Sequence, residues 1–145
     1  MITSEQTDKL WPAFFKAQRS FKAVSKGGKN DHFKSKYSTL GDTMDSIDAG
    51  LEENGLIVLQ DEEVENGTAR IVTRIVHAES GQWLEGGITF PFPATASPQV
   101  VGSLVTYGRR YGLAALCCLV SDDDDGNAAS SIFTAAKQAA GNLRH

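Results

Sequence analysis

The feature that most constrains the fold is a regular alternation of side chains over Thr68–His77. In an extended chain, successive side chains point to opposite faces of the sheet. One face of this stretch would carry Arg70 and Arg74 between valines, and the other would carry mainly alanine, isoleucine and threonine. Turn signals flank the stretch, because Asn66-Gly67 precedes it and Ser80-Gly81 follows it. The pattern therefore predicts a strand inside an antiparallel sheet.

Two further stretches complete the predicted sheet. Leu56–Gln60 is a short apolar run, and Gln82–Phe92 alternates apolar with polar or small residues until Pro91 and Pro93 end it. Strands that follow one another in the chain usually lie side by side. We therefore expect a three-stranded antiparallel meander.

Helical periodicity is found on both sides of the predicted strands. A first helix is expected from about Glu5 to Val24, with its true start near Leu10. A second is expected from a cap at Thr39, or at the serine before it, to Asn54-Gly55. A long third helix is expected over about Gln99–Leu119. The predicted fold class is α+β: two N-terminal helices, the three-stranded meander and a long helix packed on one face of the sheet.

The predicted third helix contains three glycines, at Gly102, Gly108 and Gly112. Each glycine lowers helix stability by roughly 1 kcal/mol relative to alanine. Close packing has to offset that loss, so we expect this helix to approach another backbone or the sheet closely.

The length of 145 residues fits one domain, which we place at residues 1–127, with residues 128–145 as a tail or the start of a further C-terminal region. No apolar run approaches the roughly 20 residues that a membrane span needs. The two cysteines, Cys117 and Cys118, are adjacent in an apolar run. We expect both to be small buried residues in a reducing compartment.

The formal net charge of −4 argues against nucleic-acid binding, but the charges are segregated along the chain. Between Lys9 and Lys36 there are eight basic residues and one acid, Asp31, whereas between Asp42 and Glu65 there are nine acids and no base. A chain with this distribution can present a basic face although its total charge is negative.

Three blocks of sequence, in a fixed order, carry a resemblance to a known family. They are KNDHFKSKYSTL at residues 29–40, LEENGL at residues 51–56, and GSLVTYGRRYGL at residues 102–113 followed by DDDDGN at residues 122–127. This set resembles the Erf family of phage and prophage recombination proteins, whose pattern is a Lys-Tyr element before a helix, a Ser/Thr-Tyr-x-Arg-Arg/Lys-Tyr element inside a late helix, and an acidic turn. The segment His77–Trp83 is similar to the family's hairpin turn. The resemblance covers roughly residues 10–130.

The resemblance implies binding and annealing of single-stranded DNA in phage homologous recombination, by an oligomeric ring or filament with the β-β-β-α core of annealing proteins. It also implies the cytoplasm of a bacterial host, no membrane, and a phage exonuclease or a host single-strand-binding protein as candidate partners. The chain carries no Gly-x-x-x-x-Gly-Lys-Ser/Thr motif and no spaced nuclease carboxylates. We therefore expect a binding module that is independent of ATP and is not an enzyme.

The residues predicted to contact DNA are basic or aromatic, because phosphate contacts and base stacking do not depend on sequence. They are Lys29, Lys34, Lys36, Tyr37, Arg70, Arg74, Tyr107, Arg109 and Arg110.

Each group has a structural alternative. Arg109 and Arg110 diverge by about 100° on a helix, so one could face DNA while the other forms a salt bridge to the sheet or to a neighbouring subunit. The structural alternative is an ion pair with the Asp122–Asp125 turn. Arg70 and Arg74, about 13 Å apart on one strand face, could simply be exposed. Tyr37 could anchor its loop to the core, and Tyr107 could be core or stacking surface. Tyr111 and Trp83 are expected to serve packing.

The acidic run Asp122–Asp125 invites a magnesium site, but consecutive carboxylates point in different directions. A solvated acidic turn is favoured, and no cofactor is expected. Two other functions share parts of this pattern. One is a protective single-stranded nucleic-acid-binding protein without annealing activity, and the other is a protein-interaction scaffold that uses the acids of Asp42–Glu65.

Overall fold

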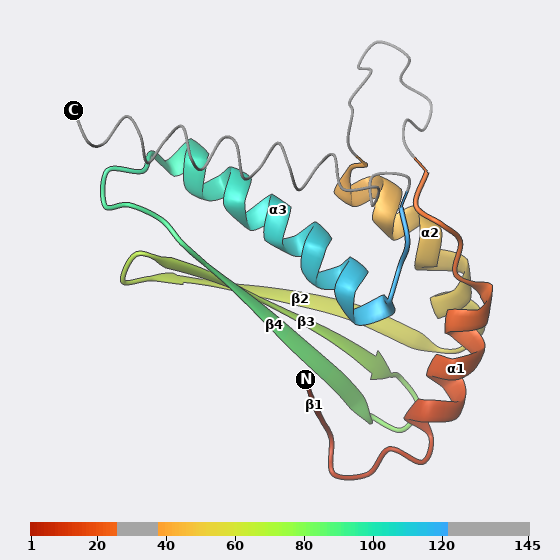
Figure 1. Cartoon of the computed structure of the whole chain (residues 1–145). Coiled ribbons are helices and arrows are strands. Elements are labelled where there is room, and N and C mark those ends of the chain that lie inside the picture. The colour runs from red at the N-terminus through yellow and green to blue at the C-terminus, as the bar shows by residue number, and fades with distance from the viewer. Residues whose placement is uncertain (26–37, 122–145) are drawn as a thin grey trace.

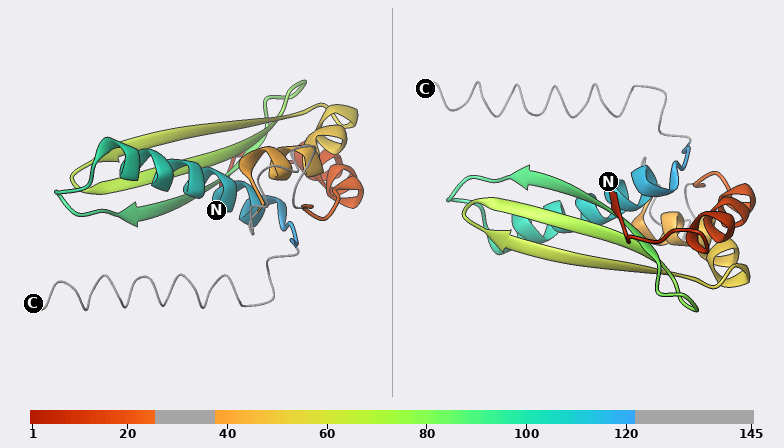
Figure 2. Two further views of the ribbon diagram at one scale, coloured as in Figure 1. Left: turned by 90° about the horizontal axis from the view of Figure 1, so that it is seen from above. Right: turned by 90° about the horizontal axis from the view of Figure 1, so that it is seen from below.

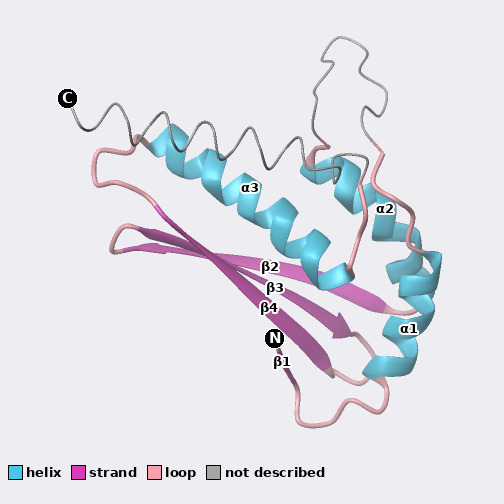
Figure 3. Ribbon diagram, in the orientation of Figure 1, coloured by secondary structure: helices cyan, strands magenta, loops and turns pink. Residues whose placement is uncertain are grey.

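The structure is a computed structural model that describes residues 1–25 and 38–121 (Figure 1). It consists of a twisted antiparallel sheet with a long helix along one face and two shorter helices packed at one end (Figures 1 and 3). The predicted α+β class is confirmed, and the three expected helices are present in the described residues. Residues 26–37, which include four of the predicted DNA contacts, and the acidic run Asp122–Asp125 lie outside the described residues.

The sheet has four strands, not the predicted three. Strands β2 (Leu56–Glu65), β3 (Thr68–His77) and β4 (Trp83–Pro91) form the expected meander. The additional strand β1 (Ile2–Thr3) pairs antiparallel with β4, which gives the order β1-β4-β3-β2. Strand β1 has only two residues, so no periodicity could indicate it.

Strand β2 is twice as long as the predicted Leu56–Gln60, because its pairing with β3 continues to Glu65 opposite Thr68. Backbone hydrogen bonds maintain this pairing although the second half of β2 is rich in acids. The hairpin turns at Asn66 and Gly67, whose φ angles are 50° and 73°. Both angles lie in the left-handed region that this residue pair tolerates, so the predicted turn is confirmed.

The helices begin and end close to the predicted positions. Helix α1 covers Leu10–Ser20 and stops short of Val24, because Phe21 is already extended. Helix α2 covers Leu40–Glu53, and its cap at Thr39 is confirmed. The Thr39 side chain accepts a hydrogen bond from the backbone N–H of Asp42, whose carboxylate accepts one from the Thr39 backbone N–H.

Helix α3 (Pro98–Cys117) is capped by Ser97 and ends at Cys118, which has a left-handed conformation with φ 53°. The prediction that both cysteines are buried is therefore half wrong. Cys117 is fully buried, and burial raises the pKa of its thiol to about 12. Cys118 is exposed because the left-handed turn at the helix end points it outward.

The two faces of the sheet differ as the alternation in β3 predicts. Ala69, Ile71 and Ile75 are buried under the helices, whereas Arg70 is exposed on the other side. No described helix packs on this second face, which we call the open face (Figure 2).

None of the helices in the described residues combines the length and the apolar character that a membrane-spanning helix requires.

Glycines allow α3 to lie directly on the sheet. A Cβ atom at Gly108 would stand 2.6 Å from Cδ1 of Ile71, and one at Gly112 would stand 3.1 Å from Oγ1 of Thr73. The predicted close approach is confirmed at these two positions. It is not found at Gly102, where no heavy atom lies within 4 Å of such a Cβ.

Candidate nucleic-acid interface

Helix α3 carries two charged residues, Arg109 and Arg110, and both are arginines. The preceding residue, Gly108, is buried against the sheet, and the side chains of the two arginines leave the helix in directions other than that of the glycine. The predicted divergence is found: Arg109 points to the edge strand β2, and Arg110 points to the start of α2.

The guanidinium of Arg109 is held by a neutral partner. Its Nε donates to Oε1 of Gln60 at 3.2 Å, and Nε2 of Gln60 donates back to the Arg109 carbonyl at 2.8 Å. The same Nε2 also donates to Oγ1 of Thr73 at 2.9 Å. Because Gln60 carries no charge, these bonds orient the arginine without cancelling its positive charge.

Arg110 is also held by a neutral group. Its Nη1 donates to the carbonyl oxygen of Ser38, the residue just before the α2 cap. Its guanidinium carbon lies 5.6 Å from the ring centroid of Tyr107 and 5.0 Å from that of Tyr111. A guanidinium has five N–H donors, so this contact leaves donors that a phosphate could accept from.

The two tyrosines form one aromatic surface on α3. Their ring centroids are 4.2 Å apart with an interplanar angle of 31°, and Tyr107 also meets Phe90 edge to face at 5.6 Å. Burial, followed by the hydrogen bond with Tyr111, raises the pKa of Tyr107 to about 12. Tyr107 is half-buried, while the expectation that Tyr111 belongs to the core is wrong, since 38% of it is exposed. Tyr107 is more buried because its ring also packs against Phe90 of β4.

The other two predicted arginines lie on the open face, on the opposite side of the sheet from α3. Arg74 donates from Nε to Oε2 of Glu85 at 2.7 Å, and its Nη2 stands 2.5 Å from the same oxygen. Its guanidinium also lies 3.9 Å from the ring centroid of Trp83, so Trp83 packs as expected. Arg70 lies 4.0 Å from Glu63. The structure therefore does not bring the four predicted arginines together on one surface.

Four predicted contacts, Lys29, Lys34, Lys36 and Tyr37, lie outside the described residues. The chain resumes at Ser38, whose carbonyl is bound by Arg110. Ser38, the first described residue after this segment, is therefore held beside Arg110.

Sequence reasoning missed Gln60 as the partner that orients Arg109. Gln60 stands 49 positions away in the chain, in the part of β2 where the predicted strand ended. The only available signal was its alternation with Leu59 and Asp61 in an extended segment.

No group of three or more His, Cys, Asp or Glu side chains that could hold a metal ion is found in residues 1–25 and 38–121. Asp122–Asp125 lie outside these ranges, so the structure does not test the acidic turn.

Comparison with known families gives one result. The model of the ERF superfamily matches residues 12–142, nearly the whole chain. No curated protein and no solved structure matches this chain. The matched region includes α3 with Arg109 and Arg110, the tyrosine pair and the lysine-rich segment before α2. The chain therefore belongs to the ERF superfamily.

Proposed function

We propose that this protein binds single-stranded DNA and anneals complementary strands during phage recombination, without ATP and without bond chemistry. Membership of the ERF superfamily supports this at the level of the family. The observation that carries it to particular residues is the surface of α3, where Arg109 and Arg110 are oriented by uncharged partners beside a pair of stacked tyrosines.

The chemistry of this surface fits annealing. Annealing requires the negative charges of two strands to be neutralised while the base edges stay free to pair. Arg109 and Arg110 can bind phosphates of any sequence, and Tyr111 offers an exposed ring on which a base can stack. Lys34 and Lys36 would add to this surface, because the segment that carries them ends at Ser38 beside Arg110.

We further propose that the protein acts as a homo-oligomer in the cytoplasm of a bacterial host and uses neither a metal nor a cofactor. An exonuclease that produces single strands, or a host single-strand-binding protein, is the kind of partner such an activity needs. The acidic turn serves as a solvated or assembly element in this account.

The direct test uses two complementary oligonucleotides, each carrying one dye of a fluorescence transfer pair, without ATP. We expect the protein to accelerate pairing well above the spontaneous rate, and the Arg109→Gln/Arg110→Gln variant to lose most of that acceleration. Glutamine at both positions removes the charge and keeps an N–H donor and the first part of the aliphatic side chain, and circular dichroism checks that the variant is folded.

The same assay separates the alternatives. A protein that only protects single strands would bind the oligonucleotides and slow their pairing. An acidic scaffold would leave pairing unchanged and bind neither strand. Either result would overturn the proposed function.

A further inference from the structure

Arg109 is held by a hydrogen-bond network that begins in the interior of the sheet. The network starts at Thr73 of β3, which is buried under α3. Oγ1 of Thr73 accepts a hydrogen bond from Nε2 of Gln60 at 2.9 Å. The missing side chain of Gly112 leaves room for this hydroxyl, since a Cβ atom there would stand 3.1 Å from Oγ1. A buried residue of the sheet therefore fixes the position of the Gln60 amide.

The same contacts decide which way round the Gln60 amide lies. Nε2 of Gln60 donates to Thr73 and also to the carbonyl oxygen of Arg109, at 2.8 Å. This leaves Oε1 of Gln60 to accept from Nε of Arg109, at 3.2 Å. A reversed amide would bring two donors face to face, because the Arg109 guanidinium has no acceptor. The network therefore fixes the orientation of the arginine side chain.

The contact with Gln60 engages one edge of the guanidinium and leaves the other edge open. Of the five N–H donors of an arginine side chain, Gln60 binds the Nε–H. Within residues 1–25 and 38–121, no second partner of the Arg109 guanidinium is found. The remaining four N–H groups belong to Nη1 and Nη2, and such a pair can bind two oxygens of one phosphate.

The residue that holds Arg109 is neutral, although an acid lies close to it in the strand. Glu62 follows two positions after Gln60 and lies on the same face of β2. Among the described residues, Glu62 forms no ion pair with Arg109. An acid in direct contact would orient the guanidinium equally well, but it would compete with a phosphate for the same charge.

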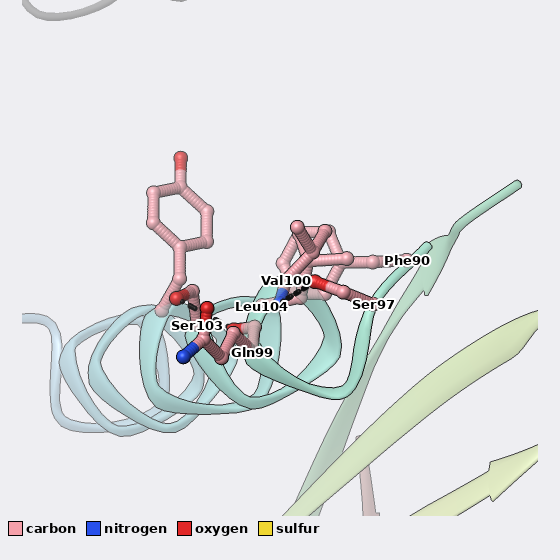
Figure 4. Close-up of a pocket in the computed structure, with 7 residues that line it drawn as sticks. Phe90, Ser97, Gln99, Val100, Ser103 and Leu104 are labelled. Atoms are coloured by element: carbon pink, nitrogen blue, oxygen red, sulfur yellow. Dashed lines mark hydrogen bonds between the residues drawn. The ribbon is translucent and has the colours of Figure 1, made fainter. Parts of the chain in front are cut away.

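The first turns of α3 offer no comparable site for a phosphate. A pocket of about 610 Å³ lies there, with Phe90, Val100 and Leu104 among its walls (Figure 4). None of the residues that line it is charged, and neither Arg109 nor Arg110 belongs to them. The cationic part of α3 is therefore its second half, where the Gln60 network ends.

We propose that Gln60 is the positioning residue for the phosphate contact of Arg109. It holds Nε so that Nη1 and Nη2 bind a phosphate of single-stranded DNA end-on, and its lack of charge keeps the arginine fully cationic. Thr73 takes part by fixing the amide, and Gln60 itself does not touch the DNA. The inference rests on the proposed function and names the residue that prepares its phosphate contact.

The first test places an acid at position 60 and measures binding of a single-stranded oligonucleotide by fluorescence anisotropy over a range of salt concentrations. We expect Gln60→Glu to weaken binding about 10-fold, as Arg109→Gln does, because the arginine is neutralised. The magnitude of the salt slope should fall by about 0.7, which corresponds to one phosphate contact.

Val64→Glu is the matched control for the added charge. Val64 is 48% exposed and lies on the same strand and face as Gln60. Four residues of strand separate the two positions by about 13 Å, which exceeds the Debye length of about 10 Å at 0.1 M salt. We expect this variant to change the affinity by less than about 2-fold and to keep the wild-type slope.

A double variant shows whether position 60 acts through the arginine. In an Arg109→Gln background, Gln60→Glu should weaken binding by less than about 2-fold more, because its target is gone. Gln60→Met keeps the length of the side chain and removes its hydrogen bonds. It should weaken binding about 3-fold with an unchanged slope, since Arg109 stays charged but is no longer held. Urea denaturation and circular dichroism check that each variant is folded.

Nuclear magnetic resonance tests the network without DNA. The Nε–H signal of Arg109 is identified by its loss in Arg109→Gln. We expect this proton to exchange slowly with solvent in the wild type, and faster in Gln60→Met and in Thr73→Val, because each variant removes one link of the network.

Three results would overturn the inference. These are a Gln60→Glu variant that binds as tightly as Val64→Glu, an equal loss from Gln60→Glu with and without Arg109, and fast exchange of the Nε–H in the wild type. Failure of the proposed function appears differently. In that case the wild-type chain binds no single strand, or Arg109→Gln binds as tightly as the wild type, whichever residue stands at position 60.

Discussion

The outer surface of α3 and the open face of the sheet each carry two arginines beside aromatic side chains, but their electrostatics differ. On the open face, Glu85 binds Arg74 and Glu63 lies near Arg70, so acids compensate both charges. On α3, the described partners of Arg109 and Arg110 are an amide and a backbone carbonyl, and no acid within residues 1–25 and 38–121 pairs with either charge. The two pairs of arginines therefore differ as phosphate ligands although their residue types are the same. The α3 pair is the better candidate.

The largest expected effect comes from removing each pair of charges in turn. Arg109→Gln/Arg110→Gln should weaken binding of a single-stranded oligonucleotide about 100-fold or more, since hydrogen bonds to charged groups contribute about 1.5–3 kcal/mol each. Arg70→Gln/Arg74→Gln should change the affinity by less than about 3-fold, because those charges are already paired. Fluorescence anisotropy at one salt concentration measures both. Equal losses for the two variants would remove the distinction between the surfaces.

A substitution under α3 should disturb that surface while leaving the open face intact. Gly108→Ala places a methyl group against Ile71 and Phe90 and should destabilise the fold by about 1–3 kcal/mol. Gly102→Ala meets no atom within 4 Å and should stabilise the helix by up to about 1 kcal/mol. Urea denaturation of the two variants tests this. A neutral Gly108→Ala would mean that α3 does not depend on close contact with the sheet.

The open face can be made more like α3 by removing one acid. Glu85→Gln leaves the charge of Arg74 unpaired, and we expect the affinity for single-stranded DNA to rise by about 2- to 5-fold. Thr89→Gln, on the same strand and face but away from Arg74, is the matched control. If Glu85→Gln binds no better than wild type, charge compensation is not what distinguishes the two faces.

The smallest effect concerns Tyr107 at alkaline pH. Its folded-state pKa of about 12 lies above the ordinary value of 10.0, so the unfolded chain loses this proton first. The corresponding contribution to stability is complete below about pH 10 and is lost as the pH rises towards 12. Tyr107→Phe should flatten the fall in stability across this window, as measured by denaturation at several pH values. An unchanged slope would show that folding does not raise the pKa of Tyr107.

Much of the fold follows from local patterns in the sequence. The alternation in β3 places Ala69 and Ile71 under the helices and Arg70 outside, and the cap at Thr39 follows from its side chain and that of Asp42. Strand β1 could not be predicted, because two residues have no period. It is instead held by tertiary contacts, including the hydrogen bonds of Ser4 with Trp83.

The site could be predicted only in part. Helical geometry alone separates Arg109 from Arg110, but their partners stand 49 and 72 positions away. Likewise, the pairing of Arg74 with Glu85 depends on the register of β3 with β4. Local sequence patterns carry no information on contacts over such separations. The sequence therefore could not distinguish the four arginines by their partners.

The salt dependence of binding to a single-stranded oligonucleotide tests most directly whether α3 is the phosphate-binding surface. The slope of log affinity against log salt falls by about 0.7 for each phosphate contact that is lost from a single strand. We predict that Arg109→Gln/Arg110→Gln lowers the magnitude of the slope by about 1.4, and that Arg70→Gln/Arg74→Gln leaves it at the wild-type value. A slope that is unchanged in the first variant and reduced in the second would contradict the account.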